Sequence, residues 1–183
     1  MSRSFDLSPV TAADVDDVHA LFGDPATWRH LPSGRFTAPD RTIAMVAGFE
    51  REWAADWLSQ SMVRAAVAWD GVEVGDVIGM AGVSPRHGSW WNVGYRFAPV
   101  AWGRGLAVLA TGESVARAHE LHPDWPVVSR LLSSNPASER VSLRLGLQER
   151  WRGPSIAEAG VDRLILADRD LDPELLTSII ALG

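Results

Sequence analysis

Apolar residues recur with a helical period of three to four in two segments near the N-terminus. The first segment, about residues 15–22, follows Thr11 and Asp14, which form a variant of the capping box, and a Gly-Asp-Pro sequence ends it. The second segment covers roughly residues 40–59. Both segments are therefore predicted to be amphipathic helices.

Much of the remaining chain favours strands, because short runs rich in β-branched and aromatic residues stand between turns that contain glycine or proline. We expect strands at residues 5–10, 63–69, 76–83, 90–97, 127–132, 147–151 and 161–166. Further helices are expected at residues 106–120, between Asn135-Pro136 and Gly146, and at residues 171–182. This order predicts an α+β or mixed α/β fold, in which an antiparallel meander precedes a strand–helix–strand–helix–strand unit.

Length and composition limit the classes of function. The 183 residues suffice for one domain with a buried core, so residues 1–183 are expected to form a single domain. No apolar run reaches the roughly 20 residues of a membrane span and no signal peptide is recognisable, so we expect a cytoplasmic protein that binds no membrane. There is no cysteine, which excludes disulfides and thiolate nucleophiles, and the five histidines form no ligand cluster, so no metal is expected. The net charge of -6 argues against direct nucleic-acid binding and fits a cationic partner such as an amine.

A glycine-rich turn, Gly103-Arg104-Gly105, stands between a predicted strand and a predicted helix. Such a turn directs backbone N–H groups at a helix N-terminus toward an anion, commonly a pyrophosphate. A P-loop needs a lysine, and the chain has 17 arginines but no lysine. A dinucleotide fingerprint needs a third glycine where the chain has Val108. From the residues alone, the open interpretations are a dinucleotide site that departs from its fingerprint and a turn that needs glycine only for its backbone conformation.

The segment Trp102-Gly-Arg-Gly-Leu-Ala resembles the coenzyme A motif [QR]-x-x-G-x-[GA] of the GNAT superfamily of N-acyltransferases. Tryptophan in the first place is similar to the RimJ/RimL-type branch, whose pattern G-Y-x-x-x-P-x-x-W-G-x-G-x-A begins at Gly94 in this chain. A second segment, residues 133–153, is similar to the branch's N-x-x-S-x-x-[VL]-x-x-x-L-G-[FL] pattern. Its matching residues are Asn135, Ser138, Val141, Leu145, Gly146 and Leu147. The resemblance covers about residues 5–166.

This resemblance implies the GNAT fold, a mostly antiparallel twisted sheet of about seven strands flanked by helices, with strands four and five splayed apart. It also implies an N-acetyltransferase that moves an acetyl group from acetyl-CoA to a primary amine by direct attack. The amine would be a protein N-terminal α-amine or a small molecule. The alternative is a non-catalytic domain that binds acyl-CoA.

The resemblance further implies which residues hold acetyl-CoA. Backbone N–H groups of the turn would bind the pyrophosphate, to which Arg104 would add a charge unless it is simply exposed. The backbone of Phe97 and Ala98 would bond the pantetheine amides, and one N–H near Phe97 would polarise the thioester carbonyl. Asn135 would reach the pantetheine from the other side, although an Asn before a proline is also a plain helix N-cap. The expected cofactor-binding residues are Phe97, Ala98, Trp102, Gly103, Arg104, Gly105, Leu106, Ala107, Asn135 and Ser138.

Fewer catalytic side chains can be assigned. Many GNAT enzymes protonate the leaving thiolate with a tyrosine on the helix after strand five, but the only tyrosine here, Tyr95, is on strand four. The branch instead implies Ser138 in this role, so Ser138 and Phe97 are the expected catalytic residues. A glutamate that the family often has just ahead of the Gly-Tyr pair is replaced by Asn92, which cannot accept a proton. The open candidates for a general base are Glu73, Asp76, His87 and His30.

The acceptor pocket is implied to lie under the first two helices and their loop. The expected lining residues there are Trp28, His30, Trp53 and Trp57, with core packing of the tryptophans as the alternative. The missing base and the acidic composition favour an amine of low pKa, such as a peptide α-amine at about 7.7–8.0. A homodimer is a candidate assembly.

Overall fold

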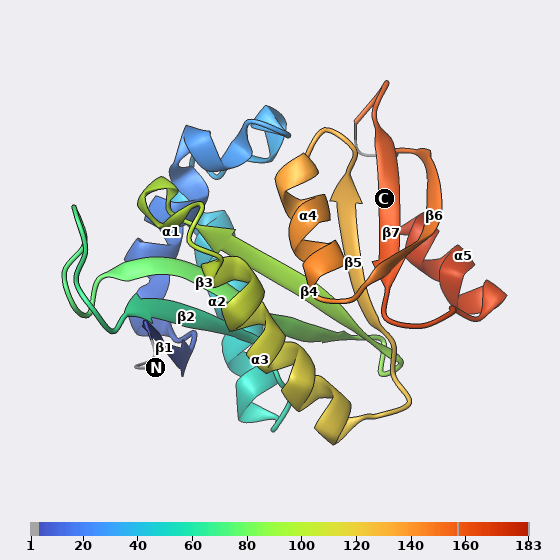
Figure 1. The fold of residues 1–183 in the computed structure, drawn as a ribbon, viewed down its shortest axis with the longest axis horizontal. Coiled ribbons are helices and arrows are strands. Elements are labelled where there is room, and N and C mark those ends of the chain that lie inside the picture. Colours follow the sequence, from blue (N-terminus) through green and yellow to red (C-terminus); the bar gives the residue numbers. More distant parts are fainter. Residues whose placement is uncertain (1–3, 157, 183) are drawn as a thin grey trace.

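A computed structural model of the chain describes residues 4–156 and 158–182 (Figure 1). Seven strands form one sheet in the order β1-β2-β3-β4-β5-β7-β6. The strands are β1 (Phe5–Pro9), β2 (Gln60–Ala65), β3 (Val77–Arg86), β4 (Trp90–Phe97), β5 (Val127–Leu132), β6 (Gln148–Pro154) and β7 (Asp162–Ala167). The α-helices are α1 (Val15–Gly23), α2 (Pro39–Ala54), α3 (Leu106–Leu121), α4 (Pro136–Arg144) and α5 (Pro173–Ala181). None of the described helices is long and apolar enough to cross a membrane.

The order and type of these elements confirm the predicted mixed fold. All neighbouring strands are antiparallel except β4 and β5, which are parallel. The capping box of Thr11 and Asp14 forms, but in front of a short 3₁₀ turn that precedes α1. The second helix ends at Ala54, five residues earlier than predicted, and β2 begins at Gln60, because residues from Gln60 onward pair with β3.

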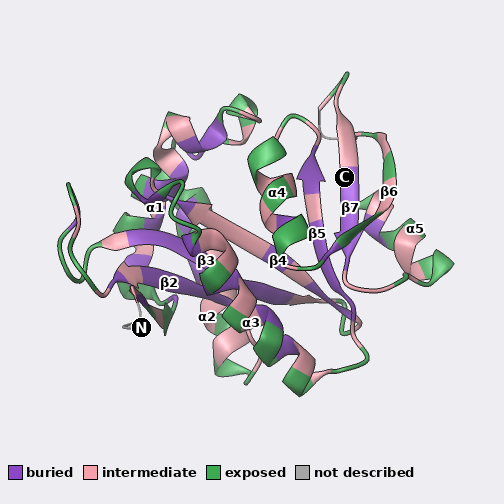
Figure 2. Cartoon of the chain, in the orientation of Figure 1, coloured by how far each residue is buried: buried purple, intermediate pink, exposed green. Residues whose placement is uncertain are grey.

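Helices cover both faces of the sheet, and the strands in the middle of the sheet are its most buried part (Figure 2). On one face, Val127 and Leu131 of β5 pack with Val115 and Ala118 of α3. Alternate residues of a strand point to opposite faces, so Val128 faces the other side, where it packs with Ile179 of α5. That second face is also covered by α1 and α2, which pack on the β1–β3 part of the sheet.

The parallel pairing of β4 with β5 is short. Trp91 pairs with Val127 and Asn92 with Val128, and the register ends there. Beyond this point the two strands diverge, so that β5 leans away from β4 in Figure 1. The strands splay as predicted, and they leave a gap in the middle of the sheet.

Side chains hold the paired end of β4 and β5 together. Trp91 lies in an aromatic cluster with Trp57, His122 and Trp125, in which the ring centroids of His122 and Trp125 are 4.2 Å apart. We call these four residues the aromatic cluster.

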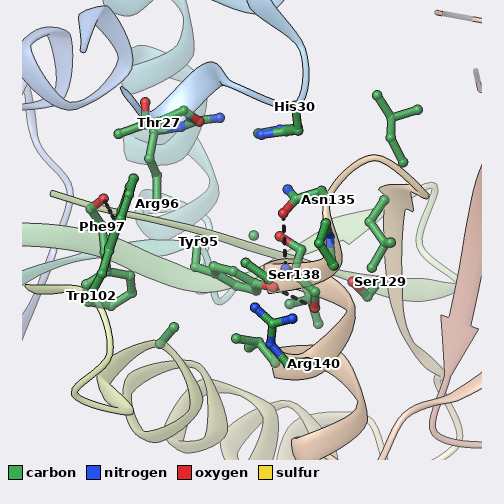
Figure 3. A pocket seen from close by; sticks show the side chains of 18 of the residues that line it. Thr27, His30, Tyr95, Arg96, Phe97, Trp102, Ser129, Asn135, Ser138 and Arg140 are labelled. Atoms are coloured by element: carbon green, nitrogen blue, oxygen red, sulfur yellow. Dashed lines mark hydrogen bonds between the residues drawn. The ribbon is translucent and has the colours of Figure 1, made fainter. Parts of the chain in front are cut away.

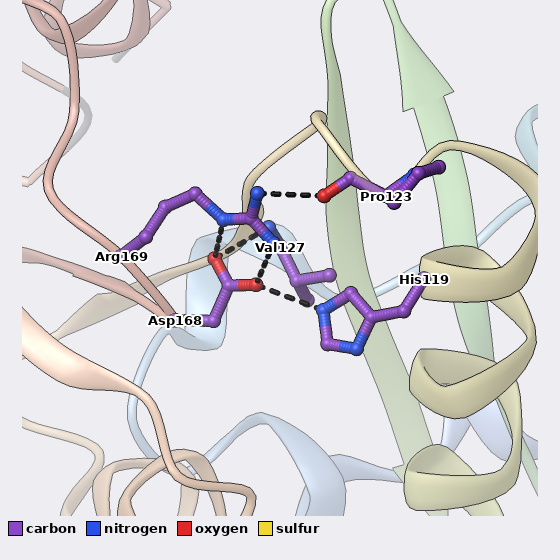
Figure 4. Close-up of polar contacts among 5 residues, drawn as sticks. All are labelled: His119, Pro123, Val127, Asp168 and Arg169. Carbon is purple, nitrogen blue, oxygen red and sulfur yellow. Dashed lines mark hydrogen bonds and ion pairs between the residues drawn. The ribbon is translucent and has the colours of Figure 1, made fainter.

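A second contact set holds the same end (Figure 4). The carboxylate of Asp168 accepts hydrogen bonds from the backbone N–H of Val127 at 3.0 Å and from Arg169, and it lies 2.8 Å from His119 Nε2 at the end of α3. Burial alone would raise the pKa of Asp168, but the hydrogen bonds from Arg169, Val127 and His119 together lower it. Asp168 therefore ties the start of β5 to α3 as an ionised carboxylate.

Candidate active site

The gap between the diverging ends of β4 and β5 opens into a cleft of about 720 Å³ (Figure 3). Its walls come from residues 93–97 of β4, the turn before α3, residues 129–132 of β5 and the first turns of α4. Residues 26, 27 and 29–31, between α1 and α2, close one side, where Ser134 Oγ donates to the carbonyl of His30 at 3.1 Å. The cleft thus passes through the sheet, from the α3 face to the α1 face.

The glycine-rich turn forms one end of the cleft. Gly103 and Gly105 have φ values of +75° and +74°, the left-handed region that favours glycine, and space near both is open. The N–H groups of residues 103–107 find no acceptor within the described chain, since the first helical bonds to Gly105 come from Val108 and Leu109. Five donors and the positive end of a 16-residue helix therefore converge at the cleft, an arrangement suited to a pyrophosphate.

The structure separates the roles of Trp102 and Arg104. Trp102 Nε1 donates to the carbonyl of Phe97 at 2.8 Å, so its indole ties the turn to the end of β4. Arg104 lies over the ring of Trp69, 4.8 Å from its centroid, and does not line the cleft. Cations at this end come instead from Arg140 and Arg144, which are four residues apart on α4 and line the cleft.

Phe97 and Ala98 present their backbones in different directions. Ala98 donates to the carbonyl of Ile78 at 3.0 Å, and its own carbonyl accepts from Ala101 at 2.9 Å. Alternate residues of an antiparallel strand bond in opposite directions, so Phe97 and Tyr95 turn their N–H groups away from β3, toward the gap. The geometry therefore supports Phe97 as a donor to a bound ligand, whereas the backbone groups of Ala98 are already used within the chain.

Asn135 and Ser138 lie on the opposite wall, at the start of α4. Asn135 is the N-cap, since its Oδ1 accepts from Ser138 N at 3.1 Å. The structural role of Asn135 is thus present, and only its amide N–H groups are left for a ligand.

The side chain of Tyr95 reaches across the cleft from β4 to the start of α4, a contact that the sequence does not reveal. Its hydroxyl donates to the carbonyl of Ser138 at 3.1 Å, so the only tyrosine reaches the start of α4 from strand four. Burial raises the pKa of this hydroxyl, while contacts with Ser138 and Ser142 offset part of the effect. Tyr95 is consequently protonated at neutral pH, and its one hydroxyl hydrogen points to the Ser138 carbonyl in this structure.

Of the residues predicted to line the acceptor pocket or to act as the general base, only some lie at the cleft. Trp28 is buried and donates to the carbonyl of Phe22 at 2.6 Å, Trp53 donates to the carbonyl of Gln60 at 2.9 Å, and Trp57 belongs to the aromatic cluster. None of these three lines the cleft, so they act in packing.

His30 is different, because it does line the cleft. Burial and the nearby charge of Arg96 lower its pKa, so its imidazole is neutral at neutral pH. The other candidate bases, Glu73, Asp76 and His87, do not line the cleft.

Charge is the feature that sequence reasoning missed. The described lining of the cleft contains no Asp or Glu, although the whole chain carries a net charge of -6. It contains Arg29, Arg96, Arg130, Arg140, Arg144 and Arg163. The acidic composition therefore does not describe the site. A signal was present, because Arg96 and Arg130 lie within mostly apolar and largely buried strands, where arginine is rare.

A central sheet split between parallel β4 and β5, with a phosphate-type turn at the split, defines an acyltransferase of the acyl-CoA class. Residues 5–148 match the acetyltransferase (GNAT) domain family, so the chain belongs to the GNAT family of acetyltransferases. No curated protein matches the sequence.

Solved structures share the fold at low sequence identity. A GNAT-family acetyltransferase from Bordetella pertussis has a TM-score of 0.72 and 21% identity, over 92% of this chain and 98% of that one. A chimera of the spermidine N-acetyltransferase SpeG from Vibrio cholerae with hSSAT has a TM-score of 0.70 and 13% identity, over 95% and 99%. RimL, a ribosomal L7/L12 α-N-protein acetyltransferase in complex with coenzyme A, has a TM-score of 0.69 and 15% identity, over 93% and 96%.

Proposed function

We propose that the protein transfers an acetyl group from acetyl-CoA to a primary amine by direct attack, without a covalent enzyme intermediate. One observation carries this proposal: the row of free N–H groups at the α3 turn lies at the mouth of the gap between β4 and β5. A thioester donor needs both features, an anion site for its pyrophosphate and a slot for its extended arm.

On the donor side, the pyrophosphate lies on the N–H groups of residues 103–107. Arg140 and Arg144 face the same end and contribute charge to the phosphates. The pantetheine arm takes the place of a strand between β4 and β5, where Tyr95 and Phe97 offer backbone donors.

The reaction forms a C–N bond between the amine and the thioester carbonyl carbon and breaks the C–S bond. The N–H of Phe97 stabilises the oxyanion, a contribution of about 10²–10³ in rate. The hydroxyl of Tyr95, with Ser138 beside it, turns its hydrogen from the Ser138 carbonyl to the leaving sulfur and gives it that proton. His30, which is neutral at neutral pH, accepts the proton that the amine loses.

The acceptors named for the neighbours, a protein N-terminus for RimL and spermidine for the chimera, represent two different amine classes. A non-catalytic acyl-CoA-binding domain is the second candidate function. Asn92 favours this alternative, because it stands where the family often has glutamate and its amide merely donates to the carbonyl of Val93 at 3.3 Å. Release of free thiol from acetyl-CoA in the presence of amines separates the two functions.

The donor site is tested with Gly105→Glu, and Gly105→Asn serves as the matched control. Both variants place a side chain at a φ of +74°, but only glutamate brings a negative charge to the N–H row. We expect Gly105→Glu to weaken acetyl-CoA binding by at least about 100-fold, which corresponds to about 2.8 kcal/mol. Titration calorimetry measures the affinity, and circular dichroism checks the fold.

Gly105→Asn should bind acetyl-CoA within a few-fold of the unsubstituted protein. Equal affinity of all three proteins would remove the turn from the donor site. Tight binding without thiol release from any amine would select the non-catalytic function.

A further inference from the structure

The face of the sheet under α1 and α2 carries a second hollow of about 220 Å³. It meets the main cleft at Gly94, Tyr95 and Arg96, which line both. Space at Gly94 is tight, since a Cβ would lie 3.0 Å from Gln60 Nε2 and would displace that side chain by a few tenths of an ångström. The donor turn opens onto the opposite face, so this hollow is the natural approach for the acceptor.

Buried polar atoms without partners point into this region. Gln60 is 3% exposed and Ser84 is 1% exposed, and both line the second hollow. Gln60 Oε1, Ser84 Oγ and Arg96 Nε have no hydrogen-bond partner within the described residues. Buried polar groups are nearly always satisfied in native proteins, so these atoms are available to hydrogen-bond water or a polar ligand in the hollow.

Three arginines share this face. Arg96 pairs with Met80, whose side chain lies under α1 and α2, while Arg130 and Arg163 lie diagonally on β5 and β7. Burial, together with the charges of Arg163 and Arg86, lowers the pKa of Arg130 to about 10. Arg130 thus lies within electrostatic reach of Arg163 and Arg86, whereas the pKa of Arg96, about 10, is lowered by burial alone.

Neither Arg96 nor Arg163 is neutralised by a carboxylate among the described residues. Glu52, on α2, is engaged by Arg86 at 3.5 Å and by Ser59 Oγ at 2.5 Å. Arg96 stacks on Trp28 at 3.7 Å and donates to the carbonyl of Thr27 at 2.6 Å. Arg96 and Arg163 form no ion pair within the described part of the chain.

These cations are distinct from those of the donor side. Arg140 and Arg144 stand on α4, on the α3 face, where the phosphates of the donor would lie. Arg96 and Arg163 point to the other face, away from the turn. Both side chains are only partly exposed and have no ion pair among the described residues, so they are available to bind an anion other than the donor phosphates.

We propose that the acceptor amine carries a carboxylate, which Arg96 and Arg163 bind on the α1 face of the sheet. The substrate class is therefore an anionic amine, such as an amino acid, and polyamines are excluded by charge repulsion. This inference rests on the proposed acetyl transfer, because it names the acceptor of the same site. Binding of a carboxylate by arginine also explains the lack of any acidic residue along the described cleft lining.

The test compares matched amines in the thiol-release assay. The pair β-alanine and β-alaninamide tests a free carboxylate, and Ala-Glu against Ala-Gln tests a peptide N-terminus with a nearby carboxylate. O-phosphoethanolamine against ethanolamine tests phosphate as the anion, and spermidine is the polycationic control. We expect kcat/KM for a carboxylate amine to exceed that for its amide by about tenfold or more. A preference for the phosphate pair alone, for neutral amines or for spermidine would overturn the proposal.

Arginine variants test which side chains cause the preference for a carboxylate amine over its amide. Arg163→Gln should lower kcat/KM for the carboxylate amine about tenfold while leaving its neutral amide and the Kd for acetyl-CoA unchanged. Arg96→Gln should lower the ratio of kcat/KM for the carboxylate amine to that for its amide about tenfold, but the rates of both amines change because the charge of Arg96 lowers the pKa of His30. Arg140→Gln, the matched control, should weaken the binding of acetyl-CoA and leave the preference for the carboxylate amine over its amide unchanged. Arg163→Gln keeps the test decisive if the packing of Arg96 is needed for folding. An unchanged preference in both variants would overturn the assignment.

Direct binding separates this inference from the proposed function. Titration calorimetry of β-alanine against the protein with coenzyme A needs no turnover. If no amine releases thiol but β-alanine binds and Arg163→Gln abolishes the binding, acetyl transfer fails and the carboxylate site stands. If thiol is released and selectivity for carboxylates is absent, transfer stands and the carboxylate site fails.

Discussion

The strands β4 and β5 pair at one end and separate at the other, and the two ends are lined by opposite kinds of side chain. At the paired end, the aromatic cluster and the carboxylate of Asp168 pack around Trp91 and Val127. At the separated end, the described cleft lining has six arginines and no carboxylate, and backbone donors of Tyr95 and Phe97 point into open space.

This difference shows how one pair of strands can stabilise the fold at one end and leave room for a ligand at the other. A parallel pair that closed along its whole length would satisfy every N–H group and leave no slot for a ligand. At the separated end, backbone N–H groups are left without partners and several arginines lie along one cleft, and both features cost free energy. The contacts at the paired end therefore have to stabilise the two strands. The stability of the paired end thus allows the separated end of β4 and β5 to keep an open slot for a ligand.

The largest effect is expected when the aromatic cluster is broken. Trp91 is 0% exposed, so Trp91→Ala should leave a cavity and lower the free energy of unfolding by about 3–5 kcal/mol. Trp102→Ala, at the separated end, removes a side chain that is 45% exposed and should cost much less. Urea unfolding of both variants measures the difference. Equal losses would mean that the two ends contribute alike and that the paired end is not the anchor.

The separated end is tested by Tyr95→Phe, which removes one hydroxyl from the cleft. If Tyr95 protonates the leaving sulfur, kcat should fall about 10- to 100-fold while the affinity for acetyl-CoA stays the same. Ser138→Ala removes the neighbouring hydroxyl and should have the smaller effect, because serine is the weaker acid. A rise in KM without a change in kcat would instead assign Tyr95 to binding, through its bond to the carbonyl of Ser138.

The sequence predicted well whatever depends on local periodicity and turn chemistry. The order of strands and helices and the capping residue Asn135 are confirmed. These features follow from which positions are apolar and which residues tolerate a given φ, and both are written locally along the chain. Boundaries moved where pairing overrode local preference, as for β2, which starts at Gln60 because that residue pairs with Gly82.

The predictions were weaker wherever distant segments meet. Tyr95 reaches Ser138 across 43 positions of sequence, and Arg96 and Arg163 share a face only because of the sheet order β4-β5-β7. Trp53 and Trp57 share helical spacing, yet Trp57 lies beyond the end of α2 and packs with Trp91. The net charge of -6 suggested a cationic partner, but a net charge sums over the whole chain and does not show which charges line the cleft.

The smallest effect concerns Asp168, whose carboxylate holds the start of β5. Asp168→Asn keeps the shape but loses the charge, and it should lower the free energy of unfolding at pH 7 by about 1–3 kcal/mol. The folded-state pKa of Asp168 is lowered, so its contribution is present above the unfolded pKa of about 3.9 and is lost as the pH falls through the folded value. The difference between the two proteins in urea midpoint should therefore be constant from pH 7 to about 5 and shrink below about 4. Asp170→Asn, which alters an exposed carboxylate paired with Arg150, is the matched control and should change little. If Asp170→Asn were as costly as Asp168→Asn, or if the difference grew as the pH fell, the carboxylate would not be what secures the paired end.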